Sequence, residues 1–275
     1  MQLPGLGFKS ACLSIKNMEI FFVGVGGGRV NLIRQINGYG TGGFAILGSR
    51  RIYVDPGPGA IVKMNGFGLL PTSIHAIIAT HNHVDHVSDA NVLVEGMSGY
   101  GNVKKGVVIG SKSVINGDEN GDRGITKYHQ NLAGRVDVAE WGKKEKFERF
   151  EIEYVKAMHD DKTTFGFKLW MDGKTIGYTS DGNFYDGIGK SYAGCDVLII
   201  NTLKPMKDNY PKHFSALVDG VEILKEAKPK LAILYHYGMK MINAGPAYVA
   251  SEVEKKTGVK TISVKDGMRI GSLFI

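Results

Sequence analysis

Three histidines and an aspartate fall within six positions of the run THNHVDH. The run follows the apolar segment 74–79, so its side chains stand on a loop directly after a buried strand. On a tight loop, His81 and His83 can aim at one point, and Asp85 and His86 at another. Imidazole and carboxylate ligands suit zinc, and paired metal ions recur in the hydrolysis of phosphate esters and amides. The run therefore indicates a site for two metal ions.

The run THNHVDH matches the H-x-H-x-D-H signature of the metallo-β-lactamase superfamily, which the chain resembles over residues 18–275. Three more pieces follow in that family's order, each after a strand-like segment: His159 in AMHDD, Asp181 in YTSDGNF and His236 in LAILYHYG. Taken alone, each of these residues would more often be structural. Their joint order favours a shared site.

The resemblance implies seven metal ligands: His81, His83 and His159 for one ion, Asp85, His86 and His236 for the other, and Asp181 bridging both. The expected cofactors are two divalent metal ions, with Zn²⁺ expected first and Mn²⁺ or Fe as alternatives. His75 is predicted to be an edge or core residue, and His129 a solvated residue, both outside the site.

The segment NTLKPMKDNYPKHFS places His213 before a predicted helix. It resembles the H-[LFS]-[ST] element of the ribonuclease Z and cyclic-phosphodiesterase branch, in which this histidine faces the scissile phosphate. The runs MEIFFVGVGGGR and RRIYVDPGPG also resemble that branch. Lys204, Lys207 and Lys212 lie nearby in the sequence and predict a phosphate-facing surface. The alternatives are that His213 is only the neighbour of a helix N-cap and that the lysines are solvated.

The glycine-rich run VGVGGGR at 23–29 does not fit the dinucleotide-binding pattern G-x-G-x-x-G, because its sixth position is Arg29. Residues 31–43 are predicted to be a glycine-bearing loop that leads into another strand. The glycines either bring backbone N–H groups near a phosphate or form a plain hairpin loop.

The order of apolar segments predicts an α+β fold. Strands are expected at 18–25, 42–49, 50–59, 74–80, 149–158, 164–171, 174–180, 195–201 and 230–236, with a final pair, and helices at 88–97, 214–227 and 247–258. With the family resemblance, this order implies one four-layer αββα sandwich domain at 18–275, after an N-terminal extension at 1–17. Residues 99–130 are glycine-rich, polar and without periodicity, which predicts a surface insertion that could cover a site.

Composition excludes few functions. With 43% hydrophobic and 22% charged residues and no long apolar run, the chain is typical of soluble proteins without a membrane span. The N-terminus does not resemble a secretory signal, so a cytoplasmic location is expected. Cys12 and Cys195 form no C-x-x-C pair and are expected to be reduced, buried thiols. The net charge of +7 slightly favours an anionic partner.

The sequence thus predicts a binuclear metal-dependent hydrolase, first of all a phosphodiesterase that attacks a small nucleotide or RNA-type phosphodiester with a metal-bridging hydroxide. The predicted catalytic residues are Asp85 and His213. One alternative is a carboxyl-ester, thioester or lactone hydrolase of the glyoxalase II or lactonase kind. Another is a non-catalytic metal-binding or RNA-binding subunit. The chain could also form a homo-oligomer.

Overall fold

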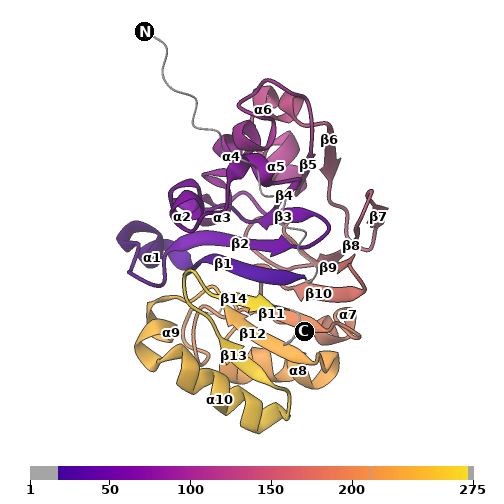
Figure 1. Cartoon of the computed structure of the whole chain (residues 1–275). Coiled ribbons are helices and arrows are strands. Elements are labelled where there is room, and N and C mark those ends of the chain that lie inside the picture. The colour runs from indigo at the N-terminus through magenta and orange to yellow at the C-terminus, as the bar shows by residue number, and fades with distance from the viewer. Residues whose placement is uncertain (1–17, 211, 272–275) are drawn as a thin grey trace.

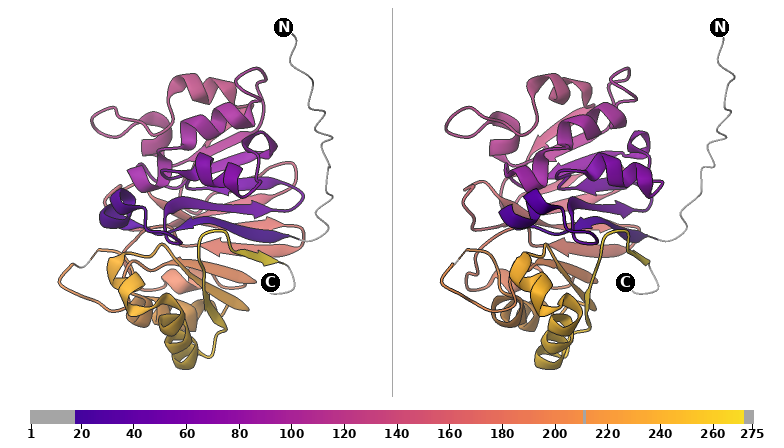
Figure 2. Two further views of the ribbon diagram at one scale, coloured as in Figure 1. Left: turned by 60° about the vertical axis from the view of Figure 1, so that its left-hand side comes forward. Right: turned by 90° about the vertical axis from the view of Figure 1, so that its left-hand side faces the viewer.

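The structure is a computed structural model that describes residues 18–210 and 212–271. These residues form two seven-stranded sheets that pack face to face, with helices against the outer face of each (Figures 1 and 2). The layers run helix, sheet, sheet, helix, which confirms the predicted αββα sandwich. The predicted N-terminal extension at 1–17 lies outside the described residues.

The first sheet has the strand order β14-β1-β2-β3-β4-β5-β6. Its strands are β1 (Glu19–Val25), β2 (Thr41–Leu47), β3 (Arg51–Val54), β4 (Ala76–Ala79), β5 (Val107–Gly110), β6 (Arg135–Val138) and β14 (Arg269–Gly271). Strands β1 to β3 pair antiparallel, and β3 to β6 pair parallel.

The second sheet has the strand order β13-β12-β11-β10-β9-β8-β7. Its strands are β7 (Lys144–Lys146), β8 (Glu151–Lys156), β9 (Phe165–Met171), β10 (Lys174–Tyr178), β11 (Val197–Asn201), β12 (Leu231–Tyr235) and β13 (Thr261–Ser263). The two last strands of the chain do not pair with each other, because β13 joins β12 and β14 joins β1.

Helices complete the outer layers. Those on the side of the first sheet are α2 (Ala60–Gly66), α4 (Ala90–Met97), α5 (Lys112–Asn116) and α6 (Lys127–Leu132), with a 3₁₀ turn at Pro71–Ser73. Those on the side of the second sheet are α7 (Ile188–Ser191), α8 (Val221–Ala227), which follows a π-helical segment at Ala216–Gly220, and α10 (Pro246–Thr257). The short helices α1 (Gly28–Arg34), α3 (Val84–Val87) and α9 (Met239–Ala244) follow strands at one end of the sandwich. No helix in the described part of the chain combines the length and apolarity that crossing a bilayer requires.

Successive side chains of a strand contribute alternately to two hydrophobic cores, one between the sheets and one under the outer helices. In β1, Ile20 and Phe22 face the other sheet, whereas Phe21 and Val23 face the helices of the outer layer. Both sheets are therefore buried on two faces, and their strand ends are held rigidly. Several strands end at the same end of the sandwich. In the first sheet, β3 and β4 run parallel. In the second sheet, β10, β11 and β12 run parallel, and β8 has the same direction because the antiparallel strand β9 separates it from β10.

The prediction of a surface insertion at 99–130 is wrong for its middle part, which contributes to the core. Strand β5 pairs with β4 and β6 inside the first sheet, and α5 packs against it. The apolar residues Val108, Ile109, Val114 and Ile115 are buried. The strand is only four residues long and lies between glycine-rich turns, so it is too short to give a readable pattern.

The prediction of a loop over residues 31–43 is wrong at its start, where α1 forms. Its apolar residues Val30 and Ile33 point outward, while the polar Asn31 is buried. The Asn31 amide donates hydrogen bonds to the backbone carbonyls of Tyr39 and Tyr237, which tie the helix to both sheets. Tertiary hydrogen bonds therefore fix a helix that hydrophobic periodicity does not indicate.

We expect Ile109→Ala to lower the free energy of unfolding by about 3 kcal/mol, because the substitution leaves a cavity between the sheets. Val103→Ala, in the same segment at a side chain that is 53% exposed, should cost about 0.5 kcal/mol or less. Denaturant unfolding of the two variants measures both values. Equal, small effects would mean that the segment is a surface insertion after all.

Candidate metal centre

Three histidines converge where β4 and β8 end. His81 and His83 follow β4, and His159 follows β8. Nδ1 of His83 lies 3.1 Å from Nε2 of His81 and 3.1 Å from Nε2 of His159. Ligands held about 2.0 Å from a tetrahedral zinc ion lie about 3.3 Å apart. The three nitrogen atoms therefore have the spacing of ligands to one ion.

A second triad lies beside the first. Nε2 of His86, on α3, lies 3.0 Å from Nε2 of His236, which follows β12. Oδ2 of Asp85 lies 3.4 Å from Nε2 of His236 and 3.8 Å from Nε2 of His86. These three atoms again surround one point.

Asp181, which follows β10, links the two triads. Its Oδ2 atom lies 3.5 Å from Nε2 of His86 in one triad and 3.9 Å from Nε2 of His159 in the other. The Nδ2 group of Asn201 donates a 2.7 Å hydrogen bond to Oδ1 and fixes the carboxylate. The structure thus brings all seven predicted ligands together, with Asp181 between the two groups.

Burial keeps the first triad neutral. It lowers the pKa of His81 well below its ordinary value, and it lowers that of His83. For His159, burial outweighs the attraction of Asp181 and lowers the pKa to about 4. Neutral imidazoles offer the lone pair that a metal ion requires.

The carboxylates have the opposite environment. Burial raises the pKa of Asp181, but His236, His86 and His213 outweigh it and hold the pKa well below its ordinary value. Burial likewise opposes ionisation of Asp85, and the neighbouring His86 and His236 bring its pKa below the ordinary value. Two ionised carboxylates therefore lie among imidazoles in a buried site, and this arrangement favours cations.

A buried carboxylate that the sequence analysis did not assign, Asp55, orients the second triad. Asp55 follows β3, and its Oδ2 lies 3.0 Å from Nδ1 of His86 and accepts a 2.9 Å hydrogen bond from the Tyr178 hydroxyl. The His86 Nδ1–H group donates to this carboxylate, so Nε2 is left facing the centre. Asp55 stands in the run VDPGPG directly after a strand, as the other site residues do, and this position is the signal that could have identified it.

Thr80 fixes His81 in the same way. Its backbone N–H and its hydroxyl both donate to the Asp55 carboxylate, at 2.8 and 2.9 Å. Because the hydroxyl proton points to Asp55, Oγ1 accepts from Nδ1 of His81, 3.2 Å away. Nε2 of His81 is then available as a ligand. A single buried carboxylate therefore sets the orientation of one histidine in each triad.

The glycine-rich run lies against the site. A side chain at Gly27 would collide with the imidazole of His236, and one at Gly57 would collide with the backbone of Asp85. The N–H group of Gly28 donates a 3.0 Å hydrogen bond to Oδ2 of Asp85. The glycines therefore allow close approach of the backbone to the centre, and one N–H group binds a carboxylate of the second triad.

His213 lies at the edge of the centre. Its Nδ1 is 3.3 Å from Oδ2 of Asp181, and its ring centroid is 4.9 Å from that of His159. Its backbone is left-handed, with φ of 68°, and its N–H group donates to Oδ1 of Asn183. A non-glycine residue held in this conformation is a recurrent feature of functional sites. The position agrees with the predicted role of His213, which itself stays a prediction.

The prediction of a phosphate-facing lysine surface is wrong for Lys204. Its side chain is buried, and its ammonium group donates to Asp208 and to the carbonyl of Tyr210. Two neighbouring lysines also form ion pairs, Lys207 with Asp219 and Lys212 with Asp160. This loop is therefore held together by its lysines, and their charges are largely offset.

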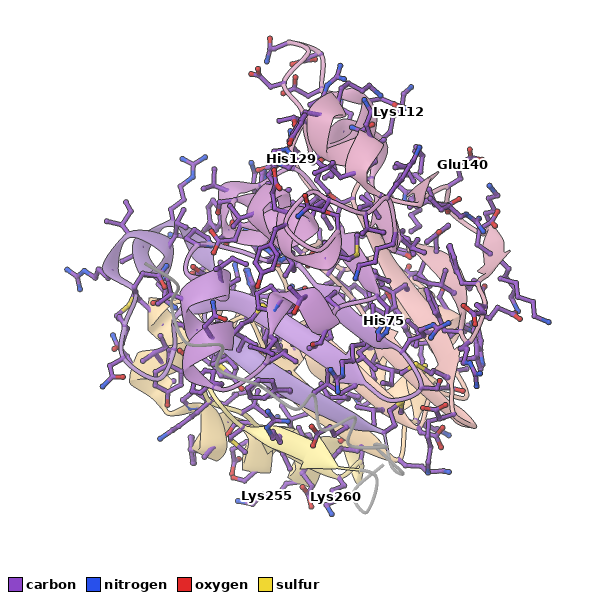
Figure 3. All side chains as sticks on the ribbon, turned by 45° about the horizontal axis from the view of Figure 1, so that its top comes forward. His75, Lys112, His129, Glu140, Lys255 and Lys260 are labelled. Atoms are coloured by element: carbon purple, nitrogen blue, oxygen red, sulfur yellow. The ribbon has the colours of Figure 1, made fainter. Side chains whose placement is uncertain are left out.

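A cleft of about 620 Å³ opens onto the centre, and we call it the active-site cleft. Its lining includes both ligand carboxylates and the predicted catalytic histidine, together with residues of α1 and of the loop after β11: Arg29, Val30, Asp85, Asp181, Leu203, Tyr210, Lys212 and His213. The two histidines predicted to lie outside the site, His75 before β4 and His129 on α6, belong to neither triad. Both are labelled in Figure 3.

Comparisons with known proteins agree with this geometry. The profile of the family described as "Beta-lactamase superfamily domain" matches residues 50–237. The uncharacterized protein MJ1374 of Methanocaldococcus jannaschii is 33% identical over 256 residues, which cover 92% of this chain and 94% of the relative.

Two solved structures share the fold at lower sequence identity. The metallo-β-lactamase fold protein YhfI of Bacillus subtilis has a TM-score of 0.74 and 19% identity, covering 93% of this chain and 99% of its own. Human tRNase Z, short form, has a TM-score of 0.65 and 17% identity, covering 92% of this chain and 98% of its own.

The sandwich and the paired triads define a protein of the metallo-β-lactamase class. The chain belongs to the beta-lactamase superfamily domain family, which confirms the predicted resemblance. Members of this family are metal-dependent hydrolases.

The residues present fit two divalent ions. Nitrogen atoms approach one another to 3.0–3.1 Å within each triad, and Thr80 and Asp55 hold Nδ1 of His81 and of His86 so that Nε2 of each ring faces the centre. Nδ1 of His236 is buried, makes no hydrogen bond among the described residues and lies 3.2 Å from Oδ1 of Asp181. Converging lone pairs beside two ionised carboxylates require positive charge at the points that they surround.

We expect Asp55→Asn to weaken zinc binding roughly 10- to 100-fold, because it disturbs the partner of His86 and the anchor of Thr80. Tyr178→Phe is the matched control: it removes a hydrogen bond to the same carboxylate but does not contact a ligand nitrogen. It should change affinity by about threefold or less. Competition with a chromophoric chelator measures both. Equal affinities in the two variants would contradict the orienting role of Asp55.

Proposed function

We propose that the protein is a binuclear metal-dependent hydrolase that cleaves phosphodiesters. The main support for this proposal is the position of Asp181: its Oδ2 atom lies near a histidine of each triad, and His213 lies beside it in the cleft. Divalent ions in such a pair supply Lewis acidity, which lowers the pKa of water toward ~7 and offsets charge on an attacked phosphate. Imidazole and carboxylate ligands favour zinc, and Mn²⁺ or Fe are alternatives.

The residues of the chain have distinct tasks in this proposal. Asp55 and Thr80 hold the imidazoles of His86 and His81 in one orientation, so the site is organised before substrate arrives. His213 lies in the cleft outside the two triads, next to His159 and Asp181, with which it forms a further group of possible metal ligands. Its imidazole can donate a hydrogen bond or a proton to an oxygen of the substrate as the transition state forms.

A phosphodiester is the preferred substrate because its transition state carries extra negative charge on the phosphate oxygens. A histidine beside the metal centre can stabilise that charge by donating a hydrogen bond. One protein of the same fold is named a tRNase, which supports the same bond type. Small nucleotide diesters and RNA ends are both candidate substrates. The complete ligand set argues against a non-catalytic metal-binding or RNA-binding subunit.

Hydrolysis of a carboxyl ester, thioester or lactone is the second candidate. The observation that favours it is the ion pairing of the lysines near His213, which leaves less positive charge for an anionic substrate than the sequence indicates. Assays of zinc-loaded protein on bis(p-nitrophenyl) phosphate, a lactone and a thioester compare the two. Turnover of the lactone or thioester with negligible phosphodiester turnover would replace the first proposal.

We expect Asp181→Ala to remove most metal from both positions, because this side chain is the one predicted to ligate both ions. His236→Ala should remove metal from the second triad only and leave about one ion per chain, since the first triad does not use it. Elemental analysis of folded, dialysed protein gives the two contents. The same loss in both variants would contradict the assignment of Asp181 as the bridge.

We expect His213→Ala to keep two metal ions and to lower kcat on a phosphodiester roughly 10²- to 10³-fold, the effect of losing one oriented donor or general acid. His129→Ala, a histidine outside the cluster, is the control and should leave the rate unchanged. Steady-state kinetics and metal analysis are measured on the same samples. An unchanged rate in His213→Ala would make this histidine structural.

A further inference from the structure

A smaller cavity of about 310 Å³ opens from the active-site cleft, between α1, the residues after β11 and the start of α9. Figure 1 shows α1 and α9 at the same end of the sandwich. The cavity and the cleft share five lining residues: Gly28, Arg29, Val30, Leu203 and Tyr210. The two spaces are therefore adjacent, and the side cavity lies next to the cleft that opens onto the metal centre.

The walls of this side cavity are apolar. The side chains of Val30, Leu203, Met239 and Tyr210 line it. Gly238 is in the wall as well, and a side chain there would come within 2.6 Å of the Leu203 carbonyl oxygen. A glycine at this position therefore allows the two backbone segments in the wall to approach closely, and its N–H group donates a 3.0 Å hydrogen bond to the Leu203 carbonyl.

Apart from Arg29, the charged side chains that line the side cavity form ion pairs with one another. Asp208 accepts hydrogen bonds from Lys204 through Oδ1 and from Lys240 through Oδ2. No ion pair of Arg29 is found within the described part of the chain, and this exposed side chain borders both spaces. The cavity thus combines apolar side chains with a net positive charge, because the single carboxylate of Asp208 faces two lysines and Arg29 lies at the junction with the cleft.

An aromatic ring also marks that junction. Tyr210 lies almost parallel to His213, with ring centroids 6.1 Å apart and an interplanar angle of 28°. A planar group that enters the side cavity therefore meets an aromatic wall directly beside the predicted catalytic histidine. The volume of about 310 Å³ is at the lower end of the range for small-molecule sites, which suits a single ring system.

We propose that the side cavity is a subsite for an aromatic ring of the substrate. The substrate is then an aryl or nucleoside ester of phosphate, and small alkyl diesters are poor substrates. This inference rests on the proposed function for the group that binds at the metal centre. Burial of the ring against Val30 and Leu203 supplies the hydrophobic contribution to binding. Arg29 can attract the anion at the junction of the two spaces.

The test compares phenylphosphonate with methylphosphonate, which bind without being hydrolysed, by titration calorimetry on the zinc-loaded protein. We expect the phenyl compound to bind at least about tenfold more tightly, the effect of burying one ring. Val30→Trp should fill the cavity and reduce this preference to about twofold or less. Val30 is 53% exposed, so the substitution does not disturb the core.

Ile33→Trp is the matched control. Ile33 is on the same helix and 82% exposed, and it does not line the side cavity. The control should keep the full preference for the phenyl compound. Equal binding of both phosphonates, no binding of either, or a preference that survives in Val30→Trp would overturn the subsite. Failure of the proposed function is seen separately, as absence of bis(p-nitrophenyl) phosphate hydrolysis by the unaltered protein.

Discussion

The convergence of ligand atoms around the buried carboxylate of Asp181 is the constraint on which the rest of the structure depends. Seven groups from the ends of strands in both sheets point their lone pairs at two neighbouring points. Such an arrangement is unfavourable unless positive charge occupies those points, because water is largely excluded and the donors repel one another. The sandwich holds these groups together, and their positions constrain the conformation of the loops that carry them.

Several features away from the centre follow from that constraint. Asp55 lies beneath both triads and uses its carboxylate oxygens to orient His86 directly and His81 through Thr80. Gly27 leaves room for His236, and the amide of Gly28 holds Asp85. The left-handed conformations of His213 and His236 are found at the same place. Backbone strain, glycine positions and buried hydrogen bonds therefore concentrate around one centre.

Apolar patterns in the sequence predicted the fold class and most strands, and the family resemblance implied the seven candidate ligands that the structure brings together. Prediction from the sequence failed where three-dimensional contacts decide the outcome. Helix α1 is fixed by the buried amide of Asn31, and β5 is stabilised by neighbours on both sides and not by a pattern of its own. Lys204 was predicted to lie on a surface, but its side chain is buried and its ammonium group donates hydrogen bonds to Asp208 and to the Tyr210 carbonyl. The place of Asp55 directly after a strand could have marked it as a site residue, but its role depends on partners 25 and 31 residues away.

The most direct test of the account is anomalous diffraction at the zinc absorption edge from crystals of the zinc-loaded protein. The account predicts two peaks, one within bonding distance of His81, His83 and His159, the other within bonding distance of Asp85, His86 and His236. Both peaks should lie beside Asp181. A single peak, or a second peak bound by His213 in place of the second triad, would contradict it.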